Sequence, residues 1–384
     1  MARDPHPDLV HFALAVGGFA IGTTEFATMS LLPYFARDLG ISAPTAGHVI
    51  SAYALGVVLG APLIAVLGAR LARRTLLIGL MLVFALANGL TGLSPSYHTM
   101  LALRFISGLP HGAYFGVAML VAASLVPANK RAQASARVLM GLTVATIIGV
   151  PCATWLGQAI GWRWAFGIVA ALSLLTASLV ALFAPYQPPE QGTSPLTELA
   201  ALENRDVLLT LAIGAIGFGG LFTVYTYLAN ALLSVTHVQE AIVPLVFAVF
   251  GAGMMSGLMI VPPFAHGRLM PVAGWILVWF AVTLAFYTLA VSHLWSITLS
   301  VFAIGLGGAL GPILQTRLMD VAGRAQTLAA ALNHSAFNVA NALGPFLGGL
   351  AIAHGYGLPS TGLVGSGLAL SGLLIWAVAA KVAV

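Results

Sequence analysis

Twelve apolar segments dominate the sequence and limit what the chain can fold into. Each is long enough to cross the hydrocarbon core of a bilayer as a helix, which takes about 20 residues. A helix suits that medium because it satisfies its own backbone hydrogen bonds. Hydrophobic residues make up 60% of the chain and charged residues 7%, whereas a soluble domain carries about 25% charged residues. The sequence therefore predicts an all-α membrane protein with twelve transmembrane helices.

We expect the twelve helices in two groups of six. Their approximate bounds are 9–32, 46–68, 75–93, 98–126, 134–157, 164–184, 207–233, 242–264, 270–291, 295–316, 326–353 and 361–382. A polar interval rich in proline and acidic residues separates the sixth helix from the seventh. The sequence predicts an N-terminal six-helix bundle over 1–184, a cytoplasmic linker over 185–206 and a C-terminal six-helix bundle over 207–384. The first segment is too long for the apolar core of a signal peptide, so we expect it to remain as a span.

The two groups of helices also share a spaced pattern. Arg131 begins an Arg-Ala-Gln sequence that is followed twenty residues later by Pro151. Arg324 begins the same sequence and is followed by Pro345 after twenty-one residues. A parallel repeat of this kind sets two pseudo-symmetric halves side by side, with a ligand site between them near mid-membrane. Two helices that merely share glycine and proline are the alternative interpretation.

Basic residues in the loops predict how the chain is oriented. One side of the membrane receives Arg3, Arg70, Arg73, Arg74, Lys130, Arg131, Arg137, Arg205, Arg268, Arg317, Arg324 and Lys381. The other side receives only Arg37 and Arg163. Because cytoplasmic loops are the ones enriched in Lys and Arg, we expect both termini in the cytoplasm.

Composition and motifs argue against several other classes of protein. The net charge of +5 comes from short loops, and no basic face with interleaved aromatic residues predicts nucleic-acid binding. The single cysteine, Cys152, can form no intrachain disulfide, and no group of Cys or His has metal-ligand spacing. There is no HExxH, GxSxG or Walker motif, so we expect neither an enzyme nor a cofactor. A channel would need a selectivity ring, which two similar halves in one chain do not predict.

One acid and one base lie inside the predicted helices, Glu25 and Arg104. Glu25 is eight residues from Pro33, and Arg104 is seven residues from Tyr97, both counted from the outer ends of their helices. At about 1.5 Å per residue, both side chains lie roughly 10 to 12 Å deep. We therefore expect these opposite charges to form an ion pair in a medium that is otherwise dry.

The expected pair can act as a proton switch. A nearby arginine favours the ionised form of Glu25, whereas desolvation favours its protonated form. A carboxyl group whose proton affinity changes with its surroundings can take up a proton on one side of the membrane and release it on the other. His111, two turns after Arg104, would extend a polar path toward the cytoplasm. A static ion pair that only fixes two helices, and a histidine that is merely hydrogen-bonded, are the alternatives.

Polar and aromatic residues on other helices are candidates for a substrate cavity. The helix over 326–353 has an unusual density of polar residues, namely Asn333, His334, Ser335, Asn338 and Asn341. The helix over 207–233 carries aromatic and amide side chains suited to an amphiphilic ligand. The residues expected to line the cavity are Thr24, Phe115, Phe222, Tyr225, Tyr227, Asn230, Asn333, His334 and Asn338. Interhelical hydrogen bonding and core packing are the alternatives.

Two segments carry a family resemblance. GGFAIGTTEFATMSLLPYFARDLGIS and the following SAYALGVVLGAPL closely resemble the drug:proton antiporter branch of the major facilitator superfamily, and bacterial arabinose-efflux-type permeases within it. The likeness spans essentially the whole chain. It implies a location in the bacterial inner membrane and two bundles that rock around a central cavity lined by helices 1, 4, 7 and 10. It also implies proton coupling at Arg104, which Gly108 follows as in the family's helix 4 motif, and at the helix 1 acid, Glu25.

Other positions depart from the family's motifs. The gate motif between helices 2 and 3 is partly present as Arg70, Arg73 and Arg74, but Ala69 replaces its usual aspartate. His266 stands where the second half would carry an acid. The antiporter glycine-proline motif is altered in helix 5, where Val150 precedes Pro151, and is intact in helix 11 as GPFLGG over 344–349.

These features together predict a proton-coupled secondary transporter that exports a small organic molecule, drug, sugar or nucleoside-like, by alternating access. We expect the proton gradient to supply the energy without a cofactor, and we expect the protein to work as a monomer in the lipid bilayer. Proton symport into the cell and a non-transporting membrane sensor are the two alternatives. The direction of flux and the presence of counterflow would distinguish them.

Overall fold

A computed structural model of the chain describes residues 6–68, 70–127, 130–187, 204–265, 267–322 and 326–382. Within these ranges the chain is helical, without a strand, and twelve of its helices are long and apolar enough to cross a membrane. The predicted fold class is confirmed. The predicted linker lies mostly outside the described residues, so its boundaries stay a prediction.

The first half of the chain forms six spans. They are α1 (Pro7–Ser30), α3 (Ala43–Gly68), α4 (Arg73–Gly92), α5 (Tyr97–Ser124), the continuous α6 (Arg131–Val144), η2 (Ala145–Gly149) and α7 (Val150–Ala159), and α8 (Trp162–Phe183). A short helix, α2 (Leu32–Asp38), follows α1 because Pro33 has no N–H with which to continue the hydrogen-bond ladder. The N-terminus of α5 is capped by the Ser96 hydroxyl, which accepts from the backbone N–H of Thr99.

The second half repeats the six-span arrangement. Its elements are α10 (Arg205–Ala212), η4 (Ile213–Gly217), α11 (Gly219–Ser234), η5 (Glu240–Ile242), α12 (Val243–Ile260), η6 (Pro262–Ala265), α13 (Leu269–Ala290), α14 (Leu294–Leu306), η7 (Gly307–Ala309), α15 (Leu310–Val321), α16 (Gln326–Ala351), η8 (Ile352–Tyr356) and α17 (Ser360–Val382). Three of these twelve spans contain a π-helical turn, at η2, η4 and η8. Such turns carry one extra residue and locally redirect a helix.

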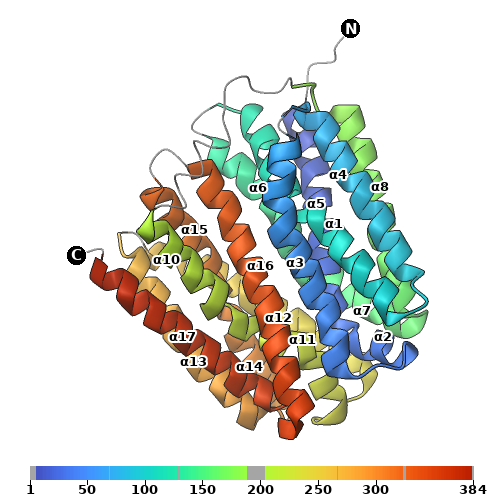
Figure 1. The fold of residues 1–384 in the computed structure, drawn as a ribbon, viewed down its shortest axis with the longest axis vertical. Coiled ribbons are helices and arrows are strands. Elements are labelled where there is room, and N and C mark those ends of the chain that lie inside the picture. The colour runs from blue at the N-terminus through green and yellow to red at the C-terminus, as the bar shows by residue number, and fades with distance from the viewer. Residues whose placement is uncertain are drawn as a thin grey trace.

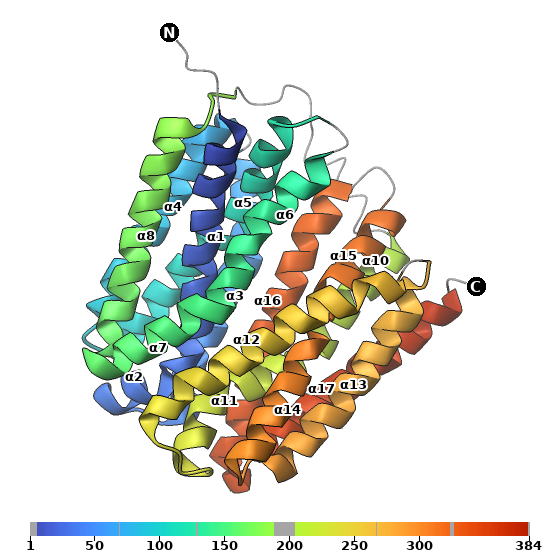
Figure 2. The ribbon, with the colours of Figure 1, turned by 180° about the vertical axis from the view of Figure 1, so that it is seen from behind.

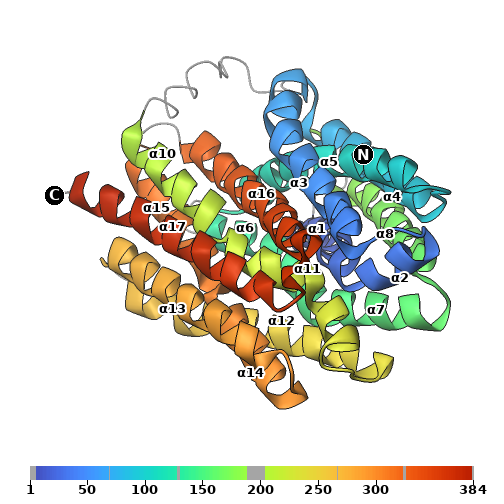
Figure 3. The same ribbon diagram turned by 60° about the horizontal axis from the view of Figure 1, so that its bottom comes forward.

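The two halves form two bundles that stand side by side (Figures 1 and 2). The bundles diverge toward the N-terminus and converge at the opposite end, where α3 packs on α16 and α7 packs on α12. Figure 3 shows α1, α3, α11, α12 and α16 meeting where the bundles join. We call the end that carries Arg73, Arg74 and Arg131 the arginine-rich end, and the end that carries Asp38 and Glu240 the opposite end.

Contacts across the two halves are formed at the opposite end. The Gln158 side chain donates across the halves to the backbone carbonyl of Glu240 over 2.7 Å, and within its own half to the Tyr34 hydroxyl over 2.9 Å. Arg37 lies 3.9 Å from the Glu240 carboxylate, but both side chains are well exposed, so this ion pair contributes little. Within the first half, the hydrogen bond from Arg163 lowers the pKa of Asp38 below its usual value. The halves are therefore held closed at this end.

Glycines set the close approach of α3 and α5. A Cβ added at Gly56 would lie 2.2 Å from the carbonyl oxygen of Phe105, and one added at Gly108 would lie 2.1 Å from that of Tyr53. Neither position can accept a side chain without moving backbone. The two helices can therefore pack tightly, as small residues allow inside membranes.

Gly108→Ala should lower the free energy of unfolding by about 1 to 3 kcal/mol, because the methyl group forces α3 and α5 apart. Thermal unfolding of the detergent-purified protein measures the effect. Gly116→Ala on the same helix is the control, since its Cβ would meet nothing within 4 Å. Equal stability of the two variants would contradict the proposed tight contact.

Candidate functional site

Glu25 lies buried in the C-terminal third of α1, where the two halves of the chain meet. The residue is 6% exposed, and no other carboxylate among the described residues is buried. Its Oε1 accepts a hydrogen bond over 3.1 Å from Nδ2 of Asn341, a fully buried residue of α16. The carboxylate thus takes part in a direct link between the N-terminal and C-terminal halves.

Arg104 lies on α5 in a site made almost entirely by the first half. Its side chain is 1% exposed, and Nη1 donates to the Thr24 hydroxyl over 3.0 Å. The Thr24 hydroxyl donates in turn to Oδ1 of Asn88 on α4 over 2.8 Å. The guanidinium carbon lies 4.1 Å from the centre of the Tyr53 ring and 5.6 Å from that of Phe166. Cation–π contacts and one charged hydrogen bond therefore stabilise the buried charge.

The predicted direct ion pair between Glu25 and Arg104 is wrong. No ion pair within 4.0 Å joins them, although the charge of Arg104 still acts on Glu25 through space. The reason lies in the helix geometry, because successive residues point about 100° apart around an α-helix. Thr24 faces Arg104, so Glu25, the next residue, faces α16 instead. Equal depth in the membrane places two side chains at the same level, but it does not fix the direction in which each points around its helix.

A chain of rings extends from Arg104 toward the arginine-rich end. The Tyr53 ring contacts Arg104, and its hydroxyl lies 3.0 Å from Nδ1 of His111. His111 lies 5.4 Å from Phe115, measured between ring centres. Phe115 stacks on His334 of α16 with ring centres 5.6 Å apart and an angle of 4° between the planes. The predicted residues His111, Phe115 and His334 are thus brought together, and they join α5 to the second half.

Aromatic residues of α11 pack against α1 beside Glu25. The ring of Phe26 lies 6.3 Å from that of Phe222 and 5.7 Å from that of Tyr225. Tyr225 also contacts Phe247 at 4.9 Å and Phe250 at 4.4 Å. The Tyr225 hydroxyl is buried without a hydrogen-bond partner. These predicted cavity residues therefore form an aromatic contact between the halves that carries one unused polar group.

Three of the four remaining predicted cavity residues have hydrogen-bond partners. Tyr227 donates to the carbonyl of Pro345 over 2.8 Å. Asn333 donates to Gln315 over 2.6 Å. Asn338 donates to a backbone carbonyl of its own helix over 2.9 Å. Asn230 retains a buried Oδ1 without a partner. Interhelical hydrogen bonding, one of the alternatives from the sequence, accounts for the amide of Asn333.

The hollows described near these residues are small or lie elsewhere. A cavity of about 10 Å³ beside Thr23, Thr24 and Phe166 is at the lower limit for one water molecule. An apolar hollow of about 390 Å³ lies between α13 and α14 at Trp279 and Phe286, away from Glu25. A central cavity large enough for a substrate stays a prediction.

The residues predicted to act at a gate lie at the arginine-rich end. Arg73 donates to Gln187 over 3.4 Å, and Arg74 donates to the carbonyl of Ala181. Arg70 is exposed in the turn that follows α3. The Arg74 bond therefore stays within the first half, and the Arg73 bond reaches the start of the predicted linker. Ala69 and His266 lie outside the described residues.

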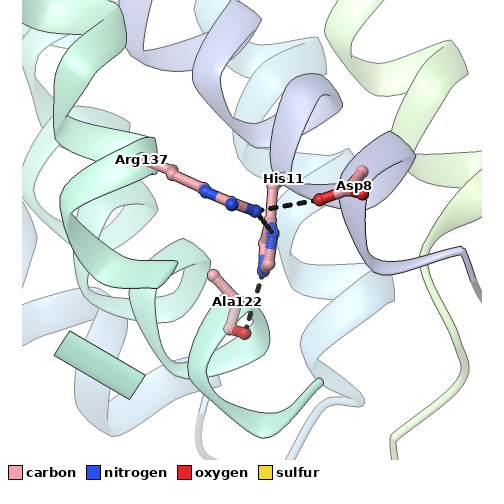
Figure 4. Close-up of polar contacts among 4 residues, drawn as sticks. All are labelled: Asp8, His11, Ala122 and Arg137. Carbon is pink, nitrogen blue, oxygen red and sulfur yellow. Dashed lines mark hydrogen bonds and ion pairs between the residues drawn. The ribbon is translucent and has the colours of Figure 1, made fainter. Parts of the chain in front are cut away.

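A second histidine cluster ties three helices together at the arginine-rich end (Figure 4). Nε2 of the buried His11 donates to the Ala122 carbonyl over 3.1 Å, near the end of α5. Nδ1 of His11 lies 3.3 Å from Nη1 of Arg137, which also donates to Asp8 over 2.9 Å. Because Arg137 can only donate, this pattern requires the tautomer with hydrogen on Nε2. The cluster fixes α1 against α5 and α6, and no pattern in the sequence indicates it.

His11→Leu should lower the free energy of unfolding by about 1 to 3 kcal/mol, because it leaves the Ala122 carbonyl without its side-chain donor. Asp8→Ala should cost no more than about 1 kcal/mol, since the Asp8 side chain is 89% exposed. Thermal unfolding in detergent measures both. A larger loss for Asp8→Ala than for His11→Leu would contradict this account of the cluster.

Some residues of the site were missed or left unassigned by the sequence analysis. Asn341 belonged to the polar density of its helix, but nothing in the sequence singled it out from four neighbours. Nothing in the sequence distinguishes Tyr53, Asn88 and Phe26 from the other apolar and polar residues of their helices. Their roles depend on which helices pack together, which one sequence does not show.

In the described part of the chain, twelve helices long and apolar enough to cross a membrane form two bundles with a buried acid where they meet, an arrangement typical of secondary transporters. The family sequence model described as Major Facilitator Superfamily matches residues 14–271. The chain belongs to the Major Facilitator Superfamily, and the resemblance noted from the sequence is confirmed.

Relatives cover nearly the whole chain. It is 41% identical over 380 residues to "Inner membrane transport protein YdhP" of Escherichia coli K12, which covers 96% of this chain and 95% of the relative. It is 35% identical to "Chloramphenicol resistance protein" of Streptomyces lividans, in an alignment that covers 95% of this chain and 93% of the relative. It is 32% identical to "Putative transporter AraJ" of Escherichia coli K12, with 96% of this chain and 94% of the relative covered. These relatives are transport and resistance proteins, and the chain is accordingly a membrane transporter and not an enzyme.

A solved structure shows the same fold. The crystal structure of a mutant form of the nucleoside transporter NupG aligns with a TM-score of 0.77 and covers 96% of this chain and 99% of its own. Sequence identity is 14%, so the likeness extends to the fold alone.

Proposed function

We propose that the protein is a proton-coupled exporter in which Glu25 carries the proton and Arg104 tunes its charge. The observation that carries the proposal is the position of Glu25, buried where the two halves meet and hydrogen-bonded to the opposite half. An ionisable group inside a membrane protein is expensive to maintain and is a functional site by default. Substrate binding and protonation of Glu25 each weaken the other in this scheme, through the nearby charge of Arg104.

The names of relatives favour export. One relative is named for chloramphenicol resistance, and the resemblance within the family is to arabinose-efflux-type permeases. A small organic molecule with apolar and polar parts suits the aromatic cluster beside Glu25 and the unpartnered Tyr225 hydroxyl. We therefore propose chloramphenicol and arabinose as the first probes.

The proton gradient is sufficient to drive such export. One charge that moves through 100 mV releases about 2.3 kcal/mol, which corresponds to roughly a 50-fold concentration ratio of substrate. The pH difference adds to this. The proposal therefore includes no nucleotide or metal, and it places both termini in the cytoplasm of a bacterial inner membrane, with one chain as the working unit.

Transport in inverted and right-side-out membrane vesicles tests the direction of flux. With a proton gradient that is acidic inside inverted vesicles, export from the cytoplasm is seen as accumulation of labelled probe in those vesicles. An uncoupler should abolish the accumulation, whereas counterflow should persist without a gradient. Accumulation in right-side-out vesicles would establish uptake by symport instead, and absence of counterflow for every probe would favour a sensor.

A further inference from the structure

Asn341 is the one described side chain that donates a hydrogen bond to Glu25, and it does so from the other half of the protein. The two residues are 316 positions apart in the sequence. The helices that carry them, α1 and α16, both pack on α11 and on α3 where the two bundles join (Figure 3). Their contact is therefore a place at which the charge on Glu25 and the separation of the halves can influence each other.

Only one of the two polar groups of the Asn341 amide has a hydrogen-bond partner. Its Nδ2 donates to Glu25, but its Oδ1 is buried without any hydrogen-bond partner. An ionised carboxylate has no hydrogen to offer, so it cannot satisfy that oxygen. A buried acceptor without a donor destabilises the arrangement that contains it.

One proton changes this balance. When a proton from water binds the Glu25 carboxylate, the carboxyl group gains an O–H donor and keeps a carbonyl acceptor. No other bond is broken in this step. A neutral acid and a primary amide can then form a ring of two hydrogen bonds, from Nδ2 to the carbonyl oxygen and from the new O–H to Oδ1.

We propose that Asn341 is a positioning residue that converts protonation of Glu25 into closer attachment of the two halves, because the neutral acid satisfies both ends of the amide. This inference rests on the proposed role of Glu25 as the proton carrier. The proton-loaded protein then favours the arrangement closed at the opposite end. An exporter needs this preference, since the proton must be carried inward before it is released.

Of the other charged or titratable groups that act on Glu25, Arg104 and Tyr53 cannot take this role. Arg104 from α5 only donates, and the Tyr53 hydroxyl from α3 is already bonded to His111. Tyr225 from α11 is the remaining group, and its hydroxyl has no partner. On the other elements that pack on α1, the charged groups Arg131, Arg163, Arg37 and Asp38 lie at or near helix ends. Arg137 contacts Asp8 and His11 near the start of α1.

The distance between the halves at the opposite end tests the inference. Spin labels at His98→Cys and Ser292→Cys, in a Cys152→Ser background, report this distance, because both positions are exposed and lie in different halves. Pulsed electron paramagnetic resonance in lipid nanodiscs gives the ratio of closed to open molecules. Between about pH 8 and about pH 5 this ratio should rise about two- to tenfold, the range expected for one added net hydrogen bond.

Four variants distinguish the possible causes of this pH response. Asn341→Leu should abolish the pH response, and Asn341→Asp should move its midpoint up by about one pH unit, since two carboxyl groups then share a proton. Tyr225→Phe should retain the response. Ser51→Ala is the matched control, because it removes a 2.8 Å hydrogen bond from Ser51 of α3 to the Ala342 carbonyl of α16, which also joins the two halves but has no titratable partner. It should lower the closed fraction equally at both pH values.

The outcomes distinguish this inference from the proposed function. A wild-type pH response in folded Asn341→Leu, or loss of the response in Tyr225→Phe, would overturn the role of Asn341 while leaving Glu25 as the carrier. An unchanged response and full coupled transport in Glu25→Gln would remove the carrier itself. If Asn341→Leu is not monodisperse, the midpoint of Asn341→Asp decides, and an unshifted midpoint overturns the inference.

Discussion

Glu25→Gln should abolish transport driven by a proton gradient, while the variant still binds substrate, more weakly than the wild type, and still performs counterflow. Glutamine has the size of glutamic acid and can still bond to Asn341, but it cannot release a proton. Accumulation of labelled probe in inverted vesicles should therefore fall to the level seen with an uncoupler. Exchange of labelled for unlabelled probe without a gradient should continue, because it needs no change in protonation.

Glu240→Gln is the matched control for this prediction. It makes the same chemical change at a carboxylate whose side chain is 50% exposed, where an ion pair is worth little. Gradient-driven accumulation should remain at the wild-type level. Full coupled accumulation by Glu25→Gln would contradict the role of Glu25, and equal losses in both variants would show that the effect is not specific to the buried acid.

Arg104→Lys should reduce gradient-driven accumulation by roughly tenfold or more, although the charge is retained. Lysine lacks the planar guanidinium that lies over Tyr53 while it donates to Thr24. Loss of one charged hydrogen bond costs about 1.5 to 3 kcal/mol, which corresponds to about a 10- to 150-fold change in an equilibrium. Initial rates of accumulation over a range of pH values measure the effect.

The pH profile separates a coupling role for Arg104 from a purely structural one. If Arg104 tunes the charge of Glu25, the profile of Arg104→Lys should shift along the pH axis as well as fall. Arg137→Lys is the control, at an arginine whose side chain is 43% exposed, and it should leave the profile in place. A uniform loss of rate in Arg104→Lys without any shift would support the static alternative, in which the arginine only fixes helices.

The spans could be predicted from the sequence because hydropathy and length alone decide which segments enter a bilayer. The predicted bounds 75–93 and 270–291 correspond to Arg73–Gly92 and Leu269–Ala290 in the structure. The π-helical turns could not be predicted in this way. One extra residue in a turn leaves no mark on composition, and it is stabilised by packing between distant segments.

The site was predicted in part, for a related reason. Burial of Glu25 and Arg104 followed from their isolation in apolar helices, and both side chains are buried. Their direct pairing did not follow, because depth along a helix says nothing about direction around it. The actual partners, Thr24 for Arg104 and Asn341 for Glu25, depend on how α1, α5 and α16 are placed relative to one another, and that information is not present in any one segment.

Proton release on substrate binding tests the central claim most directly. Purified protein in weakly buffered detergent, at a pH where Glu25 is partly protonated, should release protons when the substrate found in the vesicle assay is added, and a pH indicator measures them. We predict release of up to one proton per bound substrate by the wild-type protein and none by Glu25→Gln, although that variant still binds. Equal release by both proteins, or none by the wild type at any pH, would contradict the account.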